Sequence, residues 1–178
     1  EVEMPLTAAY DWIDVIVGFD DFAGAAAYGN ALACQDGILT KEIAPIAAPI
    51  PWLYFKRHQK FLKEGQSVCV VMVAEQSLDA FLAFTRRAGG DVVFNSATVE
   101  DRKGLPPAYE LAWNHTTLRA LRVDPSITYL QTLYPFPNQL ELANRMDKMF
   151  PGEVYSHLEF VRFDGNITCF GLPLVKFT

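Results

Sequence analysis

The chain has 178 residues, of which 51% are hydrophobic and 20% are charged, and its formal net charge is −6. This composition supplies enough apolar material for a packed core and excludes a disordered polypeptide. The negative charge argues against a nucleic-acid partner, because phosphate contacts require clustered Lys and Arg side chains.

Features that report on cellular location point to the cytoplasm. No apolar run approaches the roughly 20 residues of a membrane-spanning helix, and the N-terminus lacks a signal-peptide pattern. Cys34, Cys69 and Cys169 lie in apolar segments without metal-site spacing. We therefore expect three buried, reduced thiols in a cytoplasmic protein that has no membrane span and no metal site.

A strand–helix–strand pattern occurs twice in residues 1–95. Strands are predicted at residues 1–6, 12–19, 38–46, 68–73 and 91–95, and helices at residues 22–34 and from residues 75–77 to the Gly89-Gly90 stop. Asp20 and Asp21 are suited to accept hydrogen bonds from the free amides at the start of the first helix. A proline-marked insertion near residues 50–64 carries a further helix at residues 52–62. This order predicts a split βαβ, or ferredoxin-like, unit.

A second, incomplete unit is predicted at residues 126–178, after a connector at residues 96–125. The connector contains a helix at residues 109–121, on which Leu111, His115, Leu118 and Leu121 are roughly aligned. The second unit is predicted to have strands at residues 127–133 and 172–177, a helix at 139–150, and a hairpin that turns at Asp164-Gly165. The fold class is therefore α+β, with tandem ferredoxin-like subdomains and antiparallel sheets. With Glu1 first and an apolar strand last, we expect a piece of a longer protein.

The most prominent titratable group is His115, within the polar run from Asn114 to Thr117 on an otherwise apolar helix. An imidazole that titrates near neutral pH is suited to accept a proton or to bind an anionic substrate. The alternative is a histidine packed at a helix–sheet junction.

His157 and Glu159 lie two residues apart on a predicted strand and share a face with Tyr155. This face can line a substrate cavity or can be a solvated sheet face. Tyr129 and Gln131, on the preceding strand, allow the same two interpretations. No glycine-rich loop suited to a phosphate and no nucleophile–base motif occurs in the sequence, so no cofactor-binding residue is predicted.

Several segments resemble the C-terminal cap region of FAD-linked oxidases of the vanillyl-alcohol-oxidase or p-cresol-methylhydroxylase type, which includes glycolate oxidase and D-lactate dehydrogenase relatives. The segments that carry the resemblance are 17–26, 71–75, 110–113 and 156–169, the last with Asp-Gly-Asn at residues 164–166. The family's substrate-binding arginine position is Thr116 in this sequence, and a histidine of its hairpin is Thr168.

The resemblance implies the substrate-binding part of an FAD-dependent oxidoreductase that oxidises a 2-hydroxy acid or a related alcohol. The implied partners are an N-terminal FAD-binding domain of the same protein, which holds the flavin, and a small-molecule substrate; a homo-oligomer is left open. Because of the two departures, we expect His115 as the catalytic residue, and Asn114, Thr117, Tyr129, Gln131, His157 and Glu159 as substrate contacts. The alternative function is a non-catalytic ferredoxin-like module that binds a ligand or dimerises.

Overall fold

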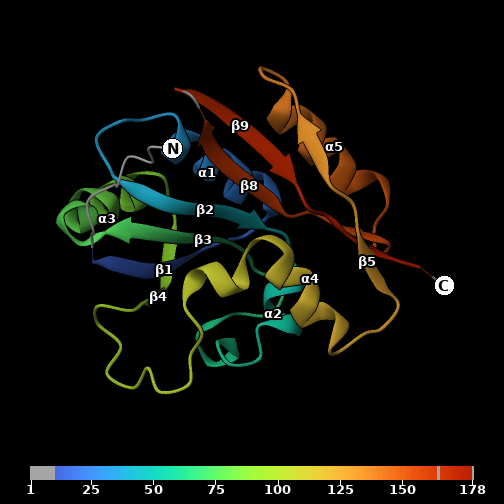
Figure 1. Cartoon of the computed structure of the whole chain (residues 1–178), viewed down its shortest axis with the longest axis horizontal. Helices are drawn as coiled ribbons and strands as arrows, with labels where there is room; N and C mark the ends of the chain where they lie inside the picture. Colours follow the sequence, from blue (N-terminus) through green and yellow to red (C-terminus); the bar gives the residue numbers. More distant parts are fainter. Residues whose placement is uncertain (1–10, 164, 178) are drawn as a thin grey trace, which may run out of the picture.

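The computed structural model describes residues 11–163 and 165–177, and it combines helices with antiparallel sheets, as predicted (Figure 1). The strand predicted at residues 1–6 lies outside the described residues. The helices are α1 (Phe22–Ala33), α2 (Ile50–Tyr54), α3 (Leu78–Arg87), α4 (Trp113–Leu121) and α5 (Gln139–Met149). The strands are β1 (Trp12–Phe19), β2 (Thr40–Ile46), β3 (Ser67–Ala74), β4 (Asp91–Asn95), β5 (Ile127–Tyr129), β6 (Thr132–Tyr134), β7 (Val154–Tyr155), β8 (Leu158–Phe163), β9 (Asn166–Gly171) and β10 (Leu174–Lys176).

The first four strands form one antiparallel sheet in the order β2-β3-β1-β4. With α1 after β1 and α3 after β3, this is the strand order of the predicted ferredoxin-like plan. Side chains of alternating residues enter different cores: Val15 and Val17 pack with α1 and α3, whereas Ile16 packs with α2 and α4 on the opposite face. Because both faces are covered, β3 is buried along its whole length, which explains its continuous apolar sequence.

Helix α1 begins as the sequence predicts and lies close to the sheet. The Asp21 side chain accepts a 2.7 Å hydrogen bond from the Gly24 amide at the helix N-terminus. Further along the helix, a Cβ atom at Gly29 would lie 2.5 Å from Pro45 and 3.2 Å from Phe160. The small side chains of this helix therefore allow the close approach to β2 and β8.

The C-terminal part forms two three-stranded sheets, β5-β10-β7 and β6-β9-β8. Strand β8 runs beside the edge strand β2 of the first sheet (Figure 1). The contact includes a bridge between Ile46 and His157 and a 2.8 Å hydrogen bond from the Ala47 amide to the Ser156 carbonyl. The first sheet and the β8–β9 hairpin are thus joined. In the hairpin itself, Gly165 has the left-handed φ (+75°) that the predicted turn requires.

Three predicted elements are wrong in their extent. The helix predicted at residues 52–62 is replaced by the short α2 and a single 3-10 turn (Gln59–Phe61), because Phe55 and His58 turn into the core between them. The strand predicted at residues 127–133 is divided into β5 and β6, which belong to different sheets. The helix predicted at residues 109–121 is a 3-10 turn (Ala108–Leu111) followed by α4, with a break at Ala112.

The predicted packing face of this last helix is also wrong. On α4 the buried residues are Thr116, Thr117 and Ala120, whereas His115, Leu118 and Leu121 are exposed. The break at Ala112 rotates the helix relative to Leu111, so a stripe that continues from Leu111 cannot remain on the buried side. The polar residues Thr116 and Thr117 therefore take the positions expected for leucines.

Of the three cysteines, Cys69 and Cys169 are buried free thiols as predicted, but Cys34 is an exposed free thiol. Cys34 is the C-cap residue of α1, at the end of the helix. Burial raises the pKa of the Cys169 thiol to about 12 and raises that of the Cys69 thiol well above its ordinary value, so both are unreactive near neutral pH.

Candidate functional site

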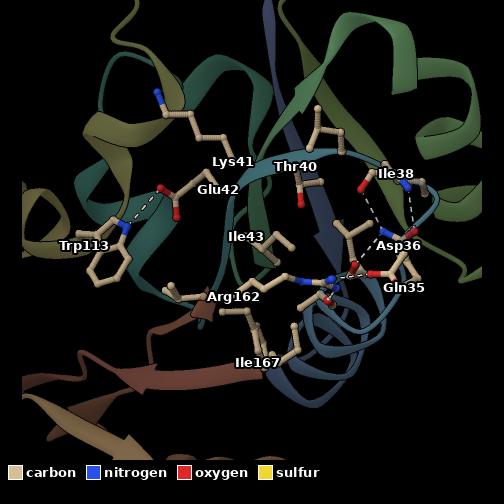
Figure 2. Close-up of a pocket in the computed structure, with 15 residues that line it drawn as sticks. Gln35, Asp36, Ile38, Thr40, Lys41, Glu42, Ile43, Trp113, Arg162 and Ile167 are labelled. Carbon is tan, nitrogen blue, oxygen red and sulfur yellow. Dashed lines mark hydrogen bonds and ion pairs between the residues drawn. The ribbon is translucent and has the colours of Figure 1, made fainter. Parts of the chain in front are cut away.

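A cavity of about 370 Å³ lies beside the exposed start of β2 and the β8–β9 hairpin (Figure 2). Its apolar lining comes from Leu32 on α1, Ile43 on β2, and Phe160 and Ile167 on the hairpin. The guanidinium of Arg162 crosses the cavity and binds the Asp36 carboxylate and the Ala33 carbonyl. Glu42 and Trp113 line the other end.

Glu42 belongs to a carboxyl cluster, which we define as Glu42, His157 and Glu159. His157 and Glu159 are 0% exposed and Glu42 is 7% exposed. The Nε2 atom of His157 lies 2.7 Å from Oε1 of Glu159. Trp113 joins the two acids: its backbone amide donates to Oε1 of Glu159 at 2.6 Å, and its indole Nε1 donates to Oε2 of Glu42 at 3.2 Å.

Burial dominates the electrostatics of this cluster. Removal from water raises the pKa of Glu42 and of Glu159 well above the ordinary value, and the charge of Glu159 raises the pKa of Glu42 further. A hydrogen bond with the Glu42 side chain and, to a smaller extent, the Trp113 amide oppose part of the effect at Glu159. Burial also lowers the pKa of His157 to about 4.

These shifts define the protonation state at neutral pH. His157 is neutral and Glu42 is a protonated, uncharged acid, so Glu159 holds whatever negative charge the cluster carries. With Glu159 ionised, Oε1 accepts hydrogen bonds from His157 Nε2–H and from the Trp113 amide. The cluster thus presents a neutral carboxylic acid at the end of the cavity, next to a second acid, Glu159, whose pKa is raised to about 7.

Trp113 adopts a left-handed backbone conformation with φ of +52°, which is uncommon for a residue with a bulky side chain. The conformation is fixed by the two hydrogen bonds to the carboxyl cluster and by a contact between the rings of Trp113 and Phe170, whose centroids are 6.0 Å apart. Backbone strain of this kind persists where surrounding contacts over-determine it, often at functional sites.

The residues predicted from the sequence to form one site lie at several different places in the structure. His157 and Glu159 are brought together in the carboxyl cluster, so their interpretation as a solvated sheet face is wrong. Gln131 is exposed and lines a neighbouring cavity of about 300 Å³ on the far side of Trp113. Tyr129, on β5, is exposed and does not line either of these two cavities.

The polar run on α4 directly follows Trp113, but among the described residues it makes no hydrogen bond to the carboxyl cluster. Asn114 and His115 are exposed, and His115 lines a separate shallow pocket. Thr117 is buried, and its hydroxyl has no hydrogen-bond partner among the described residues. Thr116 is buried as well, where its hydroxyl donates to the Leu111 carbonyl at 2.6 Å and supports the helix break.

Sequence reasoning missed Glu42, Trp113 and Arg162 as site residues. A signal for Glu42 existed, because strand alternation places it on the same face as Ala44 and Ile46, both of which are buried. No comparable local signal existed for Trp113, whose role depends on residues 46 and 71 positions away.

The start of α1, where a helix N-terminus meets a cavity, does not fit the pyrophosphate of a flavin. The start of α1 lies at a cavity of about 500 Å³, but Asp20, Asp21, Glu64 and Asp91 surround it. The amide of Gly24 is already used by Asp21, and Lys63 is paired with Asp91. A phosphate there would meet several carboxylates and no free cation within this lining, which is the opposite of a phosphate-binding loop.

Across residues 11–163 and 165–177, no group of three His, Cys, Asp or Glu side chains is arranged to hold a metal ion. The helices in the same residues are all too short or too polar to cross a bilayer. No protein-family model matches the chain, and no curated protein matches it.

Proposed function

We propose that this chain is the substrate-binding cap part of an FAD-dependent oxidoreductase that oxidises a 2-hydroxy acid or a related alcohol. In this proposal the flavin is held mainly by an N-terminal FAD-binding domain of the same protein. The observation that carries the assignment is the carboxyl cluster at the end of a cavity that also contains an arginine. The resemblance of segments 17–26, 71–75, 110–113 and 156–169 to the family supplies the reaction type.

The cavity lining suits a small molecule with a carboxylate and a short apolar part. Arg162 is suited to bind a carboxylate by paired hydrogen bonds, which would replace its present bond to Asp36. The neutral Glu42 can donate a hydrogen bond to a hydroxyl or carbonyl oxygen. Leu32, Ile43 and Phe160 provide apolar contact and exclude water from that end.

We assign to this chain only binding, orientation and the exclusion of water. The start of α1 does not fit a flavin pyrophosphate, and no redox step is assigned to the described residues. This division is common in cofactor enzymes, where the cofactor performs the chemistry and other parts of the protein position the substrate.

An exposed apolar surface on the C-terminal part supports a partner domain. Leu133, Phe136 and Phe170 are exposed, with 61% of Leu133 accessible. Leu133 and Phe170 are opposite each other on β6 and β9, and adjacent exposed apolar side chains of this kind can form an interface. The same surface favours the second candidate function, a ferredoxin-like module that dimerises without catalysis. We also propose a cytoplasmic location, in keeping with the free thiols Cys34, Cys69 and Cys169.

The test is the absorbance spectrum of the purified protein that contains this chain, followed by anaerobic addition of 2-hydroxy acids. We expect flavin bands that bleach with a 2-hydroxy acid or a related alcohol. Arg162→Gln should raise KM for the acid with little change in flavin content, and Arg87→Gln, a matched change on exposed α3, should alter neither. A colourless protein that forms dimers through Leu133 and Phe170 would support the second candidate instead.

A further inference from the structure

A second polar site lies on the face of the molecule where α2 and α4 pack together. Its lining includes Arg57 after α2, Glu110 before α4, and His115, Arg119 and Arg122 on α4. Positions 115, 119 and 122 are spaced by four and three residues, so they share one face of the helix. The pocket has a volume of about 190 Å³. We call it the arginine pocket.

Two of the three guanidiniums in the arginine pocket are held in place by the backbone. Arg57 Nη1 donates to the Gly104 carbonyl at 2.7 Å, and Arg119 Nε donates to the Glu110 carbonyl at 2.6 Å. Arg119 also pairs with the Glu110 carboxylate at 2.9 Å. Holding these groups before a ligand arrives reduces the entropy lost on binding.

The charge in the pocket is not balanced by its own residues. Three guanidiniums face one carboxylate, Glu110, although the whole chain has a net charge of −6. Burial, together with the positive charges of Arg122 and Arg57, lowers the pKa of Arg119. The exposed imidazole of His115 adds a further polar group at the rim.

We propose that the arginine pocket binds a tetrahedral dianion, namely phosphate, either free or as the phosphomonoester group of a small molecule. The guanidiniums come from two separate segments, Arg57 on one and Arg119 and Arg122 on the other, so more than one of them can bind a phosphate group, whose oxygens are arranged in three dimensions. A planar carboxylate would engage a single guanidinium fork. This site does not depend on the proposed oxidoreductase function.

The test is a titration of the purified chain with inorganic phosphate at constant ionic strength, followed by the NMR signals of the His115 ring. We expect a saturable shift with Kd on the order of 1 mM. Arg122→Gln should weaken binding by about 10-fold, which corresponds to the loss of one charge-assisted hydrogen bond. The matched control Arg87→Gln, at the end of α3, should leave Kd unchanged.

Titrations with two further compounds, glycerol 3-phosphate and malonate, show which anion the pocket prefers. Tighter binding of glycerol 3-phosphate than of inorganic phosphate identifies a phosphomonoester ligand, and the reverse identifies free phosphate. The absence of a saturable shift with either compound overturns the proposal. Equal weakening by Arg122→Gln and Arg87→Gln also overturns it, because that result reports general charge screening. Malonate that binds as tightly as phosphate overturns the tetrahedral assignment.

Discussion

The indole of Trp113 donates a hydrogen bond to Glu42, while the backbone amide of the same tryptophan donates to Glu159. One residue therefore joins two buried acids that lie on β2 and β8, strands from different sheets. This arrangement explains why a tryptophan occupies a left-handed conformation at the start of α4. Helix α4 begins at Trp113, the residue whose backbone amide donates to Glu159 of the carboxyl cluster.

Replacing Trp113 with Phe should remove the indole hydrogen bond to Glu42 and keep the ring contact with Phe170. We expect a loss of about 1 to 2 kcal/mol in the free energy of unfolding, because a buried acceptor loses its donor. Urea denaturation of Trp113→Phe, Glu42→Gln and the double variant measures the coupling between the two residues. A coupling energy of about 1 kcal/mol is expected, and independent, additive effects would contradict the assigned bond.

The raised pKa of Glu42 predicts a loss of stability at alkaline pH. The folded protein keeps the Glu42 proton at pH values where the unfolded chain, with an ordinary pKa of 4.5, has released it. Folding therefore binds a proton, and stability falls as the pH rises towards the raised folded pKa, by up to about 1.4 kcal/mol per pH unit. The free energy of unfolding between about pH 7 and pH 9 should slope less steeply in Glu42→Gln than in the natural sequence. Parallel slopes would show that Glu42 is already ionised in the folded state.

His58 should produce the opposite effect at acidic pH. Burial against Phe61 and Phe94 lowers its pKa from 6.5 to about 4, so the unfolded chain binds a proton that the folded chain excludes. Stability contributed by neutral His58 is lost as the pH falls from 6.5 to 4. His157 contributes in the same direction over the same range. In urea unfolding, the free energy of unfolding of His58→Gln should fall less steeply between pH 6.5 and pH 4 than that of the natural sequence. An equal fall in both proteins would show that other groups cause the loss of stability.

Gly29→Ala should destabilise the contact between α1 and the sheet. The new methyl group would lie 2.5 Å from Pro45 and 3.2 Å from Phe160, and neither ring can move without disturbing the core. Overpacking of this kind costs about 1 to 3 kcal/mol. Gly37→Ala is the control, because its methyl group would meet only the Gln35 side chain at 3.6 Å. Thermal unfolding should separate the two variants, with Gly29→Ala the less stable.

Much of the first unit could be predicted from the sequence because its signals are local. The apolar runs that form β1 and β3, the cap at Asp21 and the glycine stop at Gly89 identify their elements without tertiary information. The bounds of β4, residues 91–95, were predicted correctly for the same reason. The break at Ala112 could not be predicted, because it depends on an acid that is 46 residues from Trp113.

The candidate site was predictable only in part. The spacing of His157 and Glu159 correctly placed the two side chains together, but nothing in the spacing distinguished a buried pair from a solvated one. That distinction depends on β2 lying beside the segment around His157, a long-range pairing. The same pairing brings Glu42, which lies on β2, close to His157 and Glu159. The roles predicted for His115, Asn114, Thr117, Tyr129 and Gln131 stay predictions.

The bridge between Ile46 and His157 has a consequence for the unfolding of the protein. Detachment of the hairpin from β2 would uncover an unpaired strand edge and would release the histidine and both acids into water in the same event. We therefore expect the two parts of the chain to unfold together in a single transition, although their strands belong to separate sheets.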